Sequence, residues 1–287
     1  MKKLSPFEFS ETPEVVCKDH TVSHQNFELR REKKYDLLAT FPKPENDQLP
    51  EFYKSEKYIS HTDSNSTLFE KAYQRVKSFM LQKKLKWIED EKKVGGKLLD
   101  IGAGTGDFLT EAKRRGWNVS GAEPNSMARE MASKKRVSLK ENTAEFHDGE
   151  FDVITLWHVL EHVPDLEIQI NELYRLLKKD GLLVIAVPNF KSHDAKVYKE
   201  HWAAFDVPRH LYHFSRSSIQ TIFSQFDFKV ISEKGLPFDS FYVSLLSEKY
   251  RSGSSNPFKA IFTGFVSNLK ARGSGEYSSV TYFLKKS

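Results

Sequence analysis

The middle of the chain alternates between short apolar runs and segments whose apolar residues recur at helical spacing. A short apolar run predicts a buried strand, and apolar residues three or four positions apart predict an amphipathic helix. The pattern predicts strands at residues 97–101, 117–122, 151–156 and 182–187, and helices at 66–91, 108–115, 126–135 and 166–177. Strands that alternate with helices favour parallel pairing through right-handed crossovers. We therefore expect an α/β fold whose ligand lies beyond the carboxyl ends of the strands.

The two ends of the chain have a different pattern. Residues 1–65 carry scattered prolines and little periodicity, which predicts a small N-terminal module of short strands and turns. Residues 66–287 would form the main domain, in which 190–215 are expected to be a long active-site loop. The remaining pattern predicts a helix at 219–226, closing strands at 229–232 and 280–283, and a helical insertion at 239–276.

The composition is that of a globular protein, with 39% hydrophobic and 29% charged residues. The net charge of +5 is modest and its basic residues are spread along the chain, so no nucleic-acid partner is expected. The single cysteine, Cys17, cannot form an intrachain disulfide, which fits a reducing compartment. Because no run suits a membrane span or a signal peptide, we expect a soluble, cytoplasmic protein. The sequence carries no signal for an oligomeric state.

The strongest chemical signal is the run LLDIGAGTGDF at Leu98–Phe108. A predicted strand ends there and passes into Gly102, Gly104 and Gly106 before a predicted helix begins. Glycines let the backbone turn sharply and approach a ligand, and a helix N-terminus presents free N–H groups. The third glycine comes one residue earlier than in the dinucleotide fingerprint, and the Gly-Lys-Ser/Thr ending of a P-loop is absent.

Glu123 ends the second predicted strand, where an acidic side chain can accept hydrogen bonds from ribose hydroxyls. A carboxylate there would repel a 2′-phosphate, which disfavours a phosphorylated nicotinamide cofactor. A tight turn beside a surface glutamate is the simpler alternative. The glycine loop and the acid occur in the right order and at the right spacing, so together they favour a cofactor that contains a nucleoside.

This combination resembles the Rossmann-like (class I) S-adenosylmethionine-dependent methyltransferases. The resemblance covers about residues 97–189 and is carried by Asp100–Gly106, Glu123, FDVITLWHVLEHV at 151–163 and GLLVIAVPN at 181–189. It implies a seven-stranded, mostly parallel sheet with helices on both faces and an antiparallel last strand. It also implies S-adenosyl-L-methionine as the cofactor.

The resemblance implies a cofactor-binding set. The glycine loop would lie against the methionine part and Glu123 would hold the ribose, while Trp157 and His158 would line the cofactor. The full set is Asp100, Gly102, Ala103, Gly104, Gly106, Phe108, Glu123, Pro124, Trp157 and His158.

The run WAAFDVPRHLYHFS at 202–215 is similar to bacterial small-molecule methyltransferases of the quinone O-methyltransferase type. Such chains often carry an N-terminal zinc-binding segment with paired cysteines. Here Glu32 and Tyr35 stand where a C-x-x-C pair would be expected, and one cysteine cannot complete a four-ligand zinc site. We therefore expect a degenerate N-terminal segment that acts as a metal-free lid, and no bound metal.

The residues His158, Glu161 and His162 form an H-x-x-E-H string, which also occurs in zinc peptidases. The peptidase string requires a helix, whereas this one follows a predicted strand. A divalent ion near Glu161 and His162 stays an alternative to the favoured interpretation, in which His162 is a hydrogen-bonded loop anchor. His158 is expected to face the cofactor or the substrate and is a candidate catalytic residue.

A second polar cluster occupies the 202–215 run. His210 is a candidate general base, because an unperturbed histidine titrates near neutral pH. Trp202, Arg209 and His213 are candidate substrate contacts, since a guanidinium can bind an acidic group. The alternative is a structural clasp in which Arg209 bridges Asp206 and the histidines bond to the backbone.

The sequence thus predicts a methyltransferase that acts on a small-molecule acceptor, on oxygen. One alternative is a non-catalytic S-adenosylmethionine-binding regulator, suggested by the altered N-terminal module. Another is a membrane-peripheral lipid or quinone methyltransferase, suggested by the amphipathic, basic stretch Phe258–Lys270.

Overall fold

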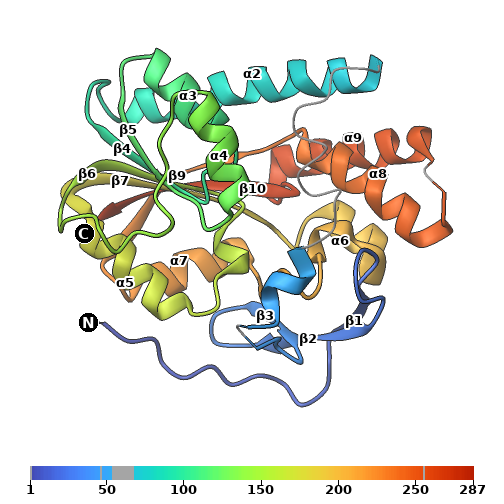
Figure 1. The fold of residues 1–287 in the computed structure, drawn as a ribbon. Helices are drawn as coiled ribbons and strands as arrows, with labels where there is room; N and C mark the ends of the chain where they lie inside the picture. The colour runs from blue at the N-terminus through green and yellow to red at the C-terminus, as the bar shows by residue number, and fades with distance from the viewer. Residues whose placement is uncertain (1, 46, 54–67, 255) are drawn as a thin grey trace. The chain divides into compact units, whose positions relative to one another are not determined.

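The computed structural model describes residues 2–45, 47–53, 68–254 and 256–287 (Figure 1). The chain divides into two compact units. The first unit comprises Met1–Ser55, His158–Ile170 and Ile185–Tyr282, and the second comprises Glu56–Trp157, Asn171–Val184 and Phe283–Ser287. The expected boundary at residues 65 and 66 lies outside the described residues, as does the predicted start of the first helix.

A six-stranded sheet flanked by helices confirms the α/β class (Figure 1). Its order is β5-β4-β6-β7-β10-β9. The strands are β4 (Lys97–Ile101), β5 (Asn118–Ala122), β6 (Phe151–Trp157), β7 (Leu177–Pro188), β9 (Phe228–Gly235) and β10 (Ser279–Lys286). β4 pairs in parallel with both β5 and β6. The end of β7 bonds to the start of β10 through Asn189 and Ser278, and Lys286 bonds back to Leu177, so β10 is antiparallel to β7.

The expected seven strands are corrected to six, because the segment after α4 makes only one bridge to the sheet. Lys140 bridges Ala122, and its backbone bonds to Gly121 and Glu123 at 2.9 Å each. The residues that follow are polar, and the Asn142 side chain accepts a hydrogen bond from the Ala144 amide at 3.0 Å. Such a side chain–backbone bond favours a turn over continued strand pairing.

The helices of the second unit match the predicted periodicity closely. They are α2 (Leu68–Glu91), α3 (Asp107–Arg114) and α4 (Ser126–Lys134). The predicted helix at 166–177 is α5 (Leu166–Leu176), which continues from the first unit into the second. Since β7 already begins at Leu177, Gly181 lies inside the strand, and a Cβ there would come 2.5 Å from the Leu177 side chain.

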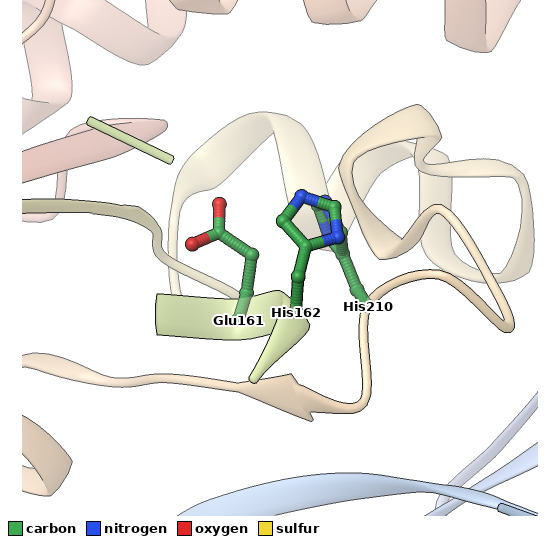
Figure 2. Close-up of side chains that lie close together, drawn as sticks. All are labelled: Glu161, His162 and His210. Atoms are coloured by element: carbon green, nitrogen blue, oxygen red, sulfur yellow. The ribbon is translucent and has the colours of Figure 1, made fainter. Parts of the chain in front are cut away.

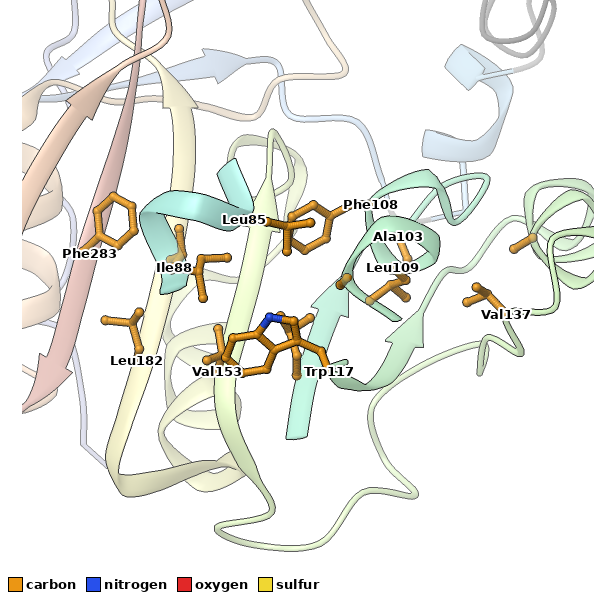
Figure 3. Close-up of a cluster of buried hydrophobic side chains, with 14 residues drawn as sticks. Leu85, Ile88, Ala103, Phe108, Leu109, Trp117, Val137, Val153, Leu182 and Phe283 are labelled. Carbon is orange, nitrogen blue, oxygen red and sulfur yellow. The ribbon is translucent and has the colours of Figure 1, made fainter. Parts of the chain in front are cut away.

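The second unit is held by one apolar cluster (Figure 3). Leu85 and Ile88 of α2 pack with residues of α3 and with side chains from β4, β6 and β7. The fully buried members are Leu85, Ile88, Leu98, Leu109, Ala112, Ala132, Val153, Leu182 and Val184. This core fixes β4 and α3, the two elements that the glycine loop connects.

The first unit contains a smaller sheet of order β1-β2-β3-β8. Its strands are β1 (Val15–Lys18), β2 (Asn26–Glu32), β3 (Leu37–Phe41) and β8 (Tyr212–His213), and all neighbours are antiparallel. A 3₁₀ turn, η1 (Leu49–Tyr53), follows β3. The expected N-terminal module therefore shares a sheet with the 202–215 run. Its role as a lid stays a prediction.

The segment expected as a loop at 190–215 is folded into short elements. They are α6 (His193–Tyr198), η3 (Lys199–His201), η4 (Ala203–Phe205) and β8. After α7 (Arg216–Ser224) and β9, the expected helical insertion consists of α8 (Asp239–Ser252) and α9 (Pro257–Ser274), which pack together. None of the described helices combines the length and the apolar character needed to cross a membrane.

The turn between β2 and β3 occupies the place of the expected cysteine pair. The Tyr35 amide donates to the Glu32 carboxylate at 2.6 Å, and both side chains are buried. Cys17 is also buried, and this burial raises the pKa of its thiol to about 12. A thiol that stays protonated is a poor metal ligand, so these residues are suited to packing.

Replacing Leu109 by alanine tests the core of the second unit. Leu109 is fully buried, so the change should lower the free energy of unfolding by about 3 kcal/mol. Ile168→Ala is the control, because Ile168 is 63% exposed and its loss should cost less than about 0.5 kcal/mol. Urea denaturation of both variants measures the difference, and equal costs would contradict the described core.

Candidate functional site

The glycine loop connects β4 to α3 in a conformation that requires glycine. Gly102, Gly104 and Gly106 have φ values of 68°, 52° and 76°, in the left-handed region that L side chains avoid. Gly106 is closely packed, since a Cβ there would come 2.9 Å from the Ala132 Cβ. Gly104 differs, because a Cβ there would have no atom within 4 Å. The loop therefore presents open space at Gly104, beside the N-terminus of α3.

Glu123 holds the glycine loop from the end of β5. One carboxylate oxygen accepts the Gly104 amide at 2.9 Å, and the other accepts the Asn125 amide at 2.9 Å. Glu123 is only 9% exposed. Hydrogen bonds from backbone N–H groups to a carboxylate are charge-assisted and strong. The carboxylate thus fixes the loop, and each oxygen keeps a lone pair for a further donor.

Asp100 lies at the carboxyl end of β4 and is buried. Thr155 of β6 donates its hydroxyl to the Asp100 carboxylate at 2.6 Å. Burial raises the pKa of Asp100 to about 7, although the bond from Thr155 favours the charged form. Asp100 therefore joins β4 to β6 two residues before the loop begins.

Asp107 begins α3 and pairs with two lysines that the sequence did not indicate as partners. Lys77 of α2 and Lys135 after α4 each place an amine 2.6 Å from its carboxylate. Despite partial burial, these amines lower the pKa of Asp107. The ion pairs tie the first turn of α3 to both neighbouring segments.

Trp157, the last residue of β6, packs beside the loop. Its ring lies 5.4 Å from that of Phe108 in an edge contact, and the Lys84 amine lies 4.1 Å from its centroid. Phe108 and Ala103 are buried, whereas Pro124 is exposed. The second unit thus brings the predicted cofactor residues from Asp100 to Trp157 together around the glycine loop.

His158 belongs to the first unit and contacts two carboxylates. Its Nδ1 lies 3.3 Å from Glu161 and its Nε2 lies 3.2 Å from Asp239. Burial alone would lower the pKa of His158, but these two carboxylates raise it to about 9. Asp239 comes from the first turn of α8, far along the chain, so no local pattern could have indicated it. His158 is therefore a cation at neutral pH, which disfavours it as a general base.

Glu161, His162 and His210 converge in the first unit (Figure 2). Their ligand atoms all lie within 4.8 Å of one another, a spacing that could hold a divalent cation. The buried Glu161 carboxylate meets only His158 Nδ1 at 3.3 Å and makes no hydrogen bond of good geometry among the described residues. His162 Nδ1 lies 3.0 Å from the Arg209 carbonyl, as expected for a loop anchor. The expectation of no bound metal stays a prediction.

The environment of His210 disfavours the predicted general base. Its Nδ1 lies 2.9 Å from the Ala204 carbonyl, and its ring packs against His162 with centroids 4.5 Å apart. Burial, followed by the nearby His162, lowers the pKa of His210 to about 4. A base is most effective when its pKa lies near the working pH, so His210 is poorly suited to accept a proton.

The 202–215 run has the contacts of the structural clasp. Arg209 Nε donates to Asp206 at 2.9 Å and its Nη1 donates to Thr21 at 2.8 Å. The Trp202 indole is 2% exposed and donates to Asp194 at 2.7 Å. His213 Nε2 lies 3.0 Å from the Thr40 hydroxyl. These contacts favour the clasp over substrate binding, and the substrate roles of Trp202, Arg209 and His213 stay predictions.

The chain is similar in sequence to known methyltransferases. Residues 69–233, more than half of the chain, match a family model described as "Methyltransferase domain". A ubiquinone biosynthesis O-methyltransferase from Pseudomonas aeruginosa (strain UCBPP-PA14) is 34% identical over 117 residues, which cover 37% of this chain and 50% of that protein. The namesake from Cronobacter sakazakii is 35% identical over 105 residues, covering 33% and 43%. The chain thus spans about half the length of the curated relatives it matches.

Solved structures share the fold. Magnesium protoporphyrin IX methyltransferase from Synechocystis PCC 6803 with bound SAH aligns with a TM-score of 0.57 and 14% identity, over 84% of this chain and all of that chain. Geranyl diphosphate C-methyltransferase from Streptomyces coelicolor A3(2) aligns with a TM-score of 0.52 and 17% identity, over 79% and 84%. At these identities the likeness concerns the fold alone, and it agrees with the α/β class read from the sequence.

The charge of His158 is open to direct measurement. Because its folded pKa lies above the ordinary value of about 6.5, its ion pairs stabilise the fold below that pH. The contribution is lost as the pH rises through about 9. An NMR titration of the His158 ring should show a midpoint near 9, and Asp239→Asn should lower it. A midpoint at or below 6.5 in the unmodified protein would contradict the two-carboxylate arrangement.

Proposed function

Because the chain belongs to the methyltransferase-domain family, we propose that it transfers the methyl group of S-adenosylmethionine to an oxygen atom of a small-molecule acceptor. The observation that carries this proposal is the glycine loop with its open side at Gly104 and its clamp at Glu123. The partial matches to O-methyltransferases support oxygen as the methylated atom. When bound, S-adenosylmethionine supplies an electrophilic methyl group on a sulfonium.

The loop residues fit this cofactor chemically. Open space at Gly104 lets the backbone approach a ligand closely, and the N-terminus of α3 favours the negative charge of a carboxylate. The lone pairs left on Glu123 can accept protons from ribose hydroxyls. Trp157, in edge contact with Phe108 and beneath the Lys84 amine, adds an aromatic wall in the same unit.

The charges of the two histidines limit which acceptors are suitable. His158 is already protonated at neutral pH, and His210 has a low pKa, so neither is suited to remove a proton from a poorly acidic alcohol. A phenol, whose hydroxyl has a pKa of about 10, needs less help than an aliphatic alcohol. Much of the rate can then come from positioning the oxygen in line with the methyl group. We infer that phenolic acceptors suit this chain best.

Calorimetric titration with S-adenosylhomocysteine tests the cofactor site. Glu123→Ala should weaken binding at least about tenfold, since it removes the ribose acceptor and leaves the Gly104 and Asn125 amides without their partner. Glu130→Ala is the matched control, because Glu130 is an exposed carboxylate on the nearby α4 and should bind as the wild type does. Equal affinities for all three proteins would contradict the role of Glu123.

Acceptor class is tested by release of S-adenosylhomocysteine from S-adenosylmethionine. Purified protein should turn over with members of a panel of phenols and catechols and not with matched primary amines. Gly104→Arg fills the open space at the loop and should abolish turnover. Turnover on amines alone would overturn oxygen transfer, while cofactor binding without turnover on any class would favour a non-catalytic binder.

A further inference from the structure

Helix α9 runs beside α8 (Figure 1). It exposes its large apolar side chains and buries its small ones. Soluble proteins normally show the opposite arrangement on a surface helix. The exposed side chains are Phe258 at 87%, Ile261 at 58%, Phe262 at 68%, Phe265 at 59% and Leu269 at 54%; we call them the α9 apolar face. The buried positions are Ala260, Thr263, Gly264, Ser267 and Ala271.

The buried side of α9 is fixed by close packing within the first unit. A Cβ at Gly264 would come 2.7 Å from the Phe241 ring of α8. Ser267 donates its hydroxyl to the buried Asp194 at 2.6 Å, and Asn268 donates to the Pro237 carbonyl at 2.8 Å. Because these contacts require small or polar residues, α9 cannot rotate to bury its phenylalanines instead.

The α9 apolar face forms one stripe. At 3.6 residues per turn, positions 258, 261, 262, 265 and 269 fall within an arc of about 100° around the helix axis. Scattered exposed apolar residues are common, but a contiguous stripe marks an interaction surface. Phenylalanine, isoleucine and leucine are the side chains that enter the acyl boundary of a bilayer.

The charges on α9 favour an anionic partner. Lys259, Lys270 and Arg272 are exposed, and Pro257–Ser274 contains no aspartate or glutamate. Basic residues beside an apolar helical stripe are typical of helices that lie in the interface of an anionic membrane. Two copies of this basic helix would instead repel each other.

We propose that the α9 apolar face docks on the surface of an anionic lipid bilayer. The phenylalanines would enter the acyl boundary, while Lys259 and Lys270 would contact lipid phosphates. Docking does not depend on methyl transfer. That it would bring the chain to acceptors dissolved in the bilayer is a consequence that rests on the proposed function.

Vesicle co-sedimentation of the full chain tests the docking. The protein should sediment with vesicles rich in phosphatidylglycerol and much less with pure phosphatidylcholine. The double variant Phe258→Ser with Phe262→Ser should bind at least about tenfold more weakly. Lys259→Glu with Lys270→Glu should also lose more than about tenfold on the anionic vesicles.

The matched control is Phe79→Ser with Ile168→Ser, which removes two apolar side chains that are 53% and 63% exposed on other helices. It should bind vesicles like the wild type. Titration of each variant with S-adenosylhomocysteine reports on the fold and cofactor site separately from docking. Loss of vesicle binding in the control as well, or none in the wild type, would overturn the proposal. Sedimentation velocity showing a dimer that Phe258→Ser with Phe262→Ser dissociates would assign the face to self-association instead.

Discussion

The hydrogen bond that the Gly104 amide donates to the Glu123 carboxylate joins the end of β5 to the glycine loop, and the Asn125 amide at the start of α4 donates to the same carboxylate. The loop needs this anchor because its glycines adopt left-handed conformations that cost backbone entropy to fix. The core of the second unit already fixes β4 and α3, the elements on either side of the loop. The Glu123 carboxylate therefore has to order only the short turn between them. In the proposed cofactor site the same carboxylate would accept hydrogen bonds from the ribose, which would link the fold to the proposed chemistry.

Burial and neighbouring charges determine the protonation states of the histidines in the first unit. His158 is held as a cation between Glu161 and Asp239, whereas His210 is held neutral beside His162. Arg209 donates hydrogen bonds to Asp206, and the Trp202 indole donates to Asp194. Because neither His158 nor His210 has a pKa near neutral pH, acceptor acidity and positioning carry more of the proposed reaction. This favours phenolic oxygens over aliphatic alcohols.

The sequence predicts most strands and helices of the α/β fold because each has a recognisable pattern of apolar residues. The predicted seventh strand is absent because Asn142 favours a turn after Lys140. The glycine loop and Glu123 could be found because they are a local pattern. The partner of His158 could not, since Asp239 reaches it only through the tertiary fold. The sequence shows α9 only as an amphipathic, basic stretch. The side-chain exposures show that its large apolar residues face outward.

A crystal structure with bound S-adenosylhomocysteine tests the central claim most directly, because it places the nucleoside relative to the glycine loop. We expect the ribose hydroxyls within hydrogen-bond distance of the Glu123 carboxylate, with the methionine part over Gly104. We also expect the Gly104 and Asn125 amides to keep their bonds to Glu123. A ligand bound away from this loop, or a ribose held by other residues while Glu123 bonds only to the backbone, would contradict that claim.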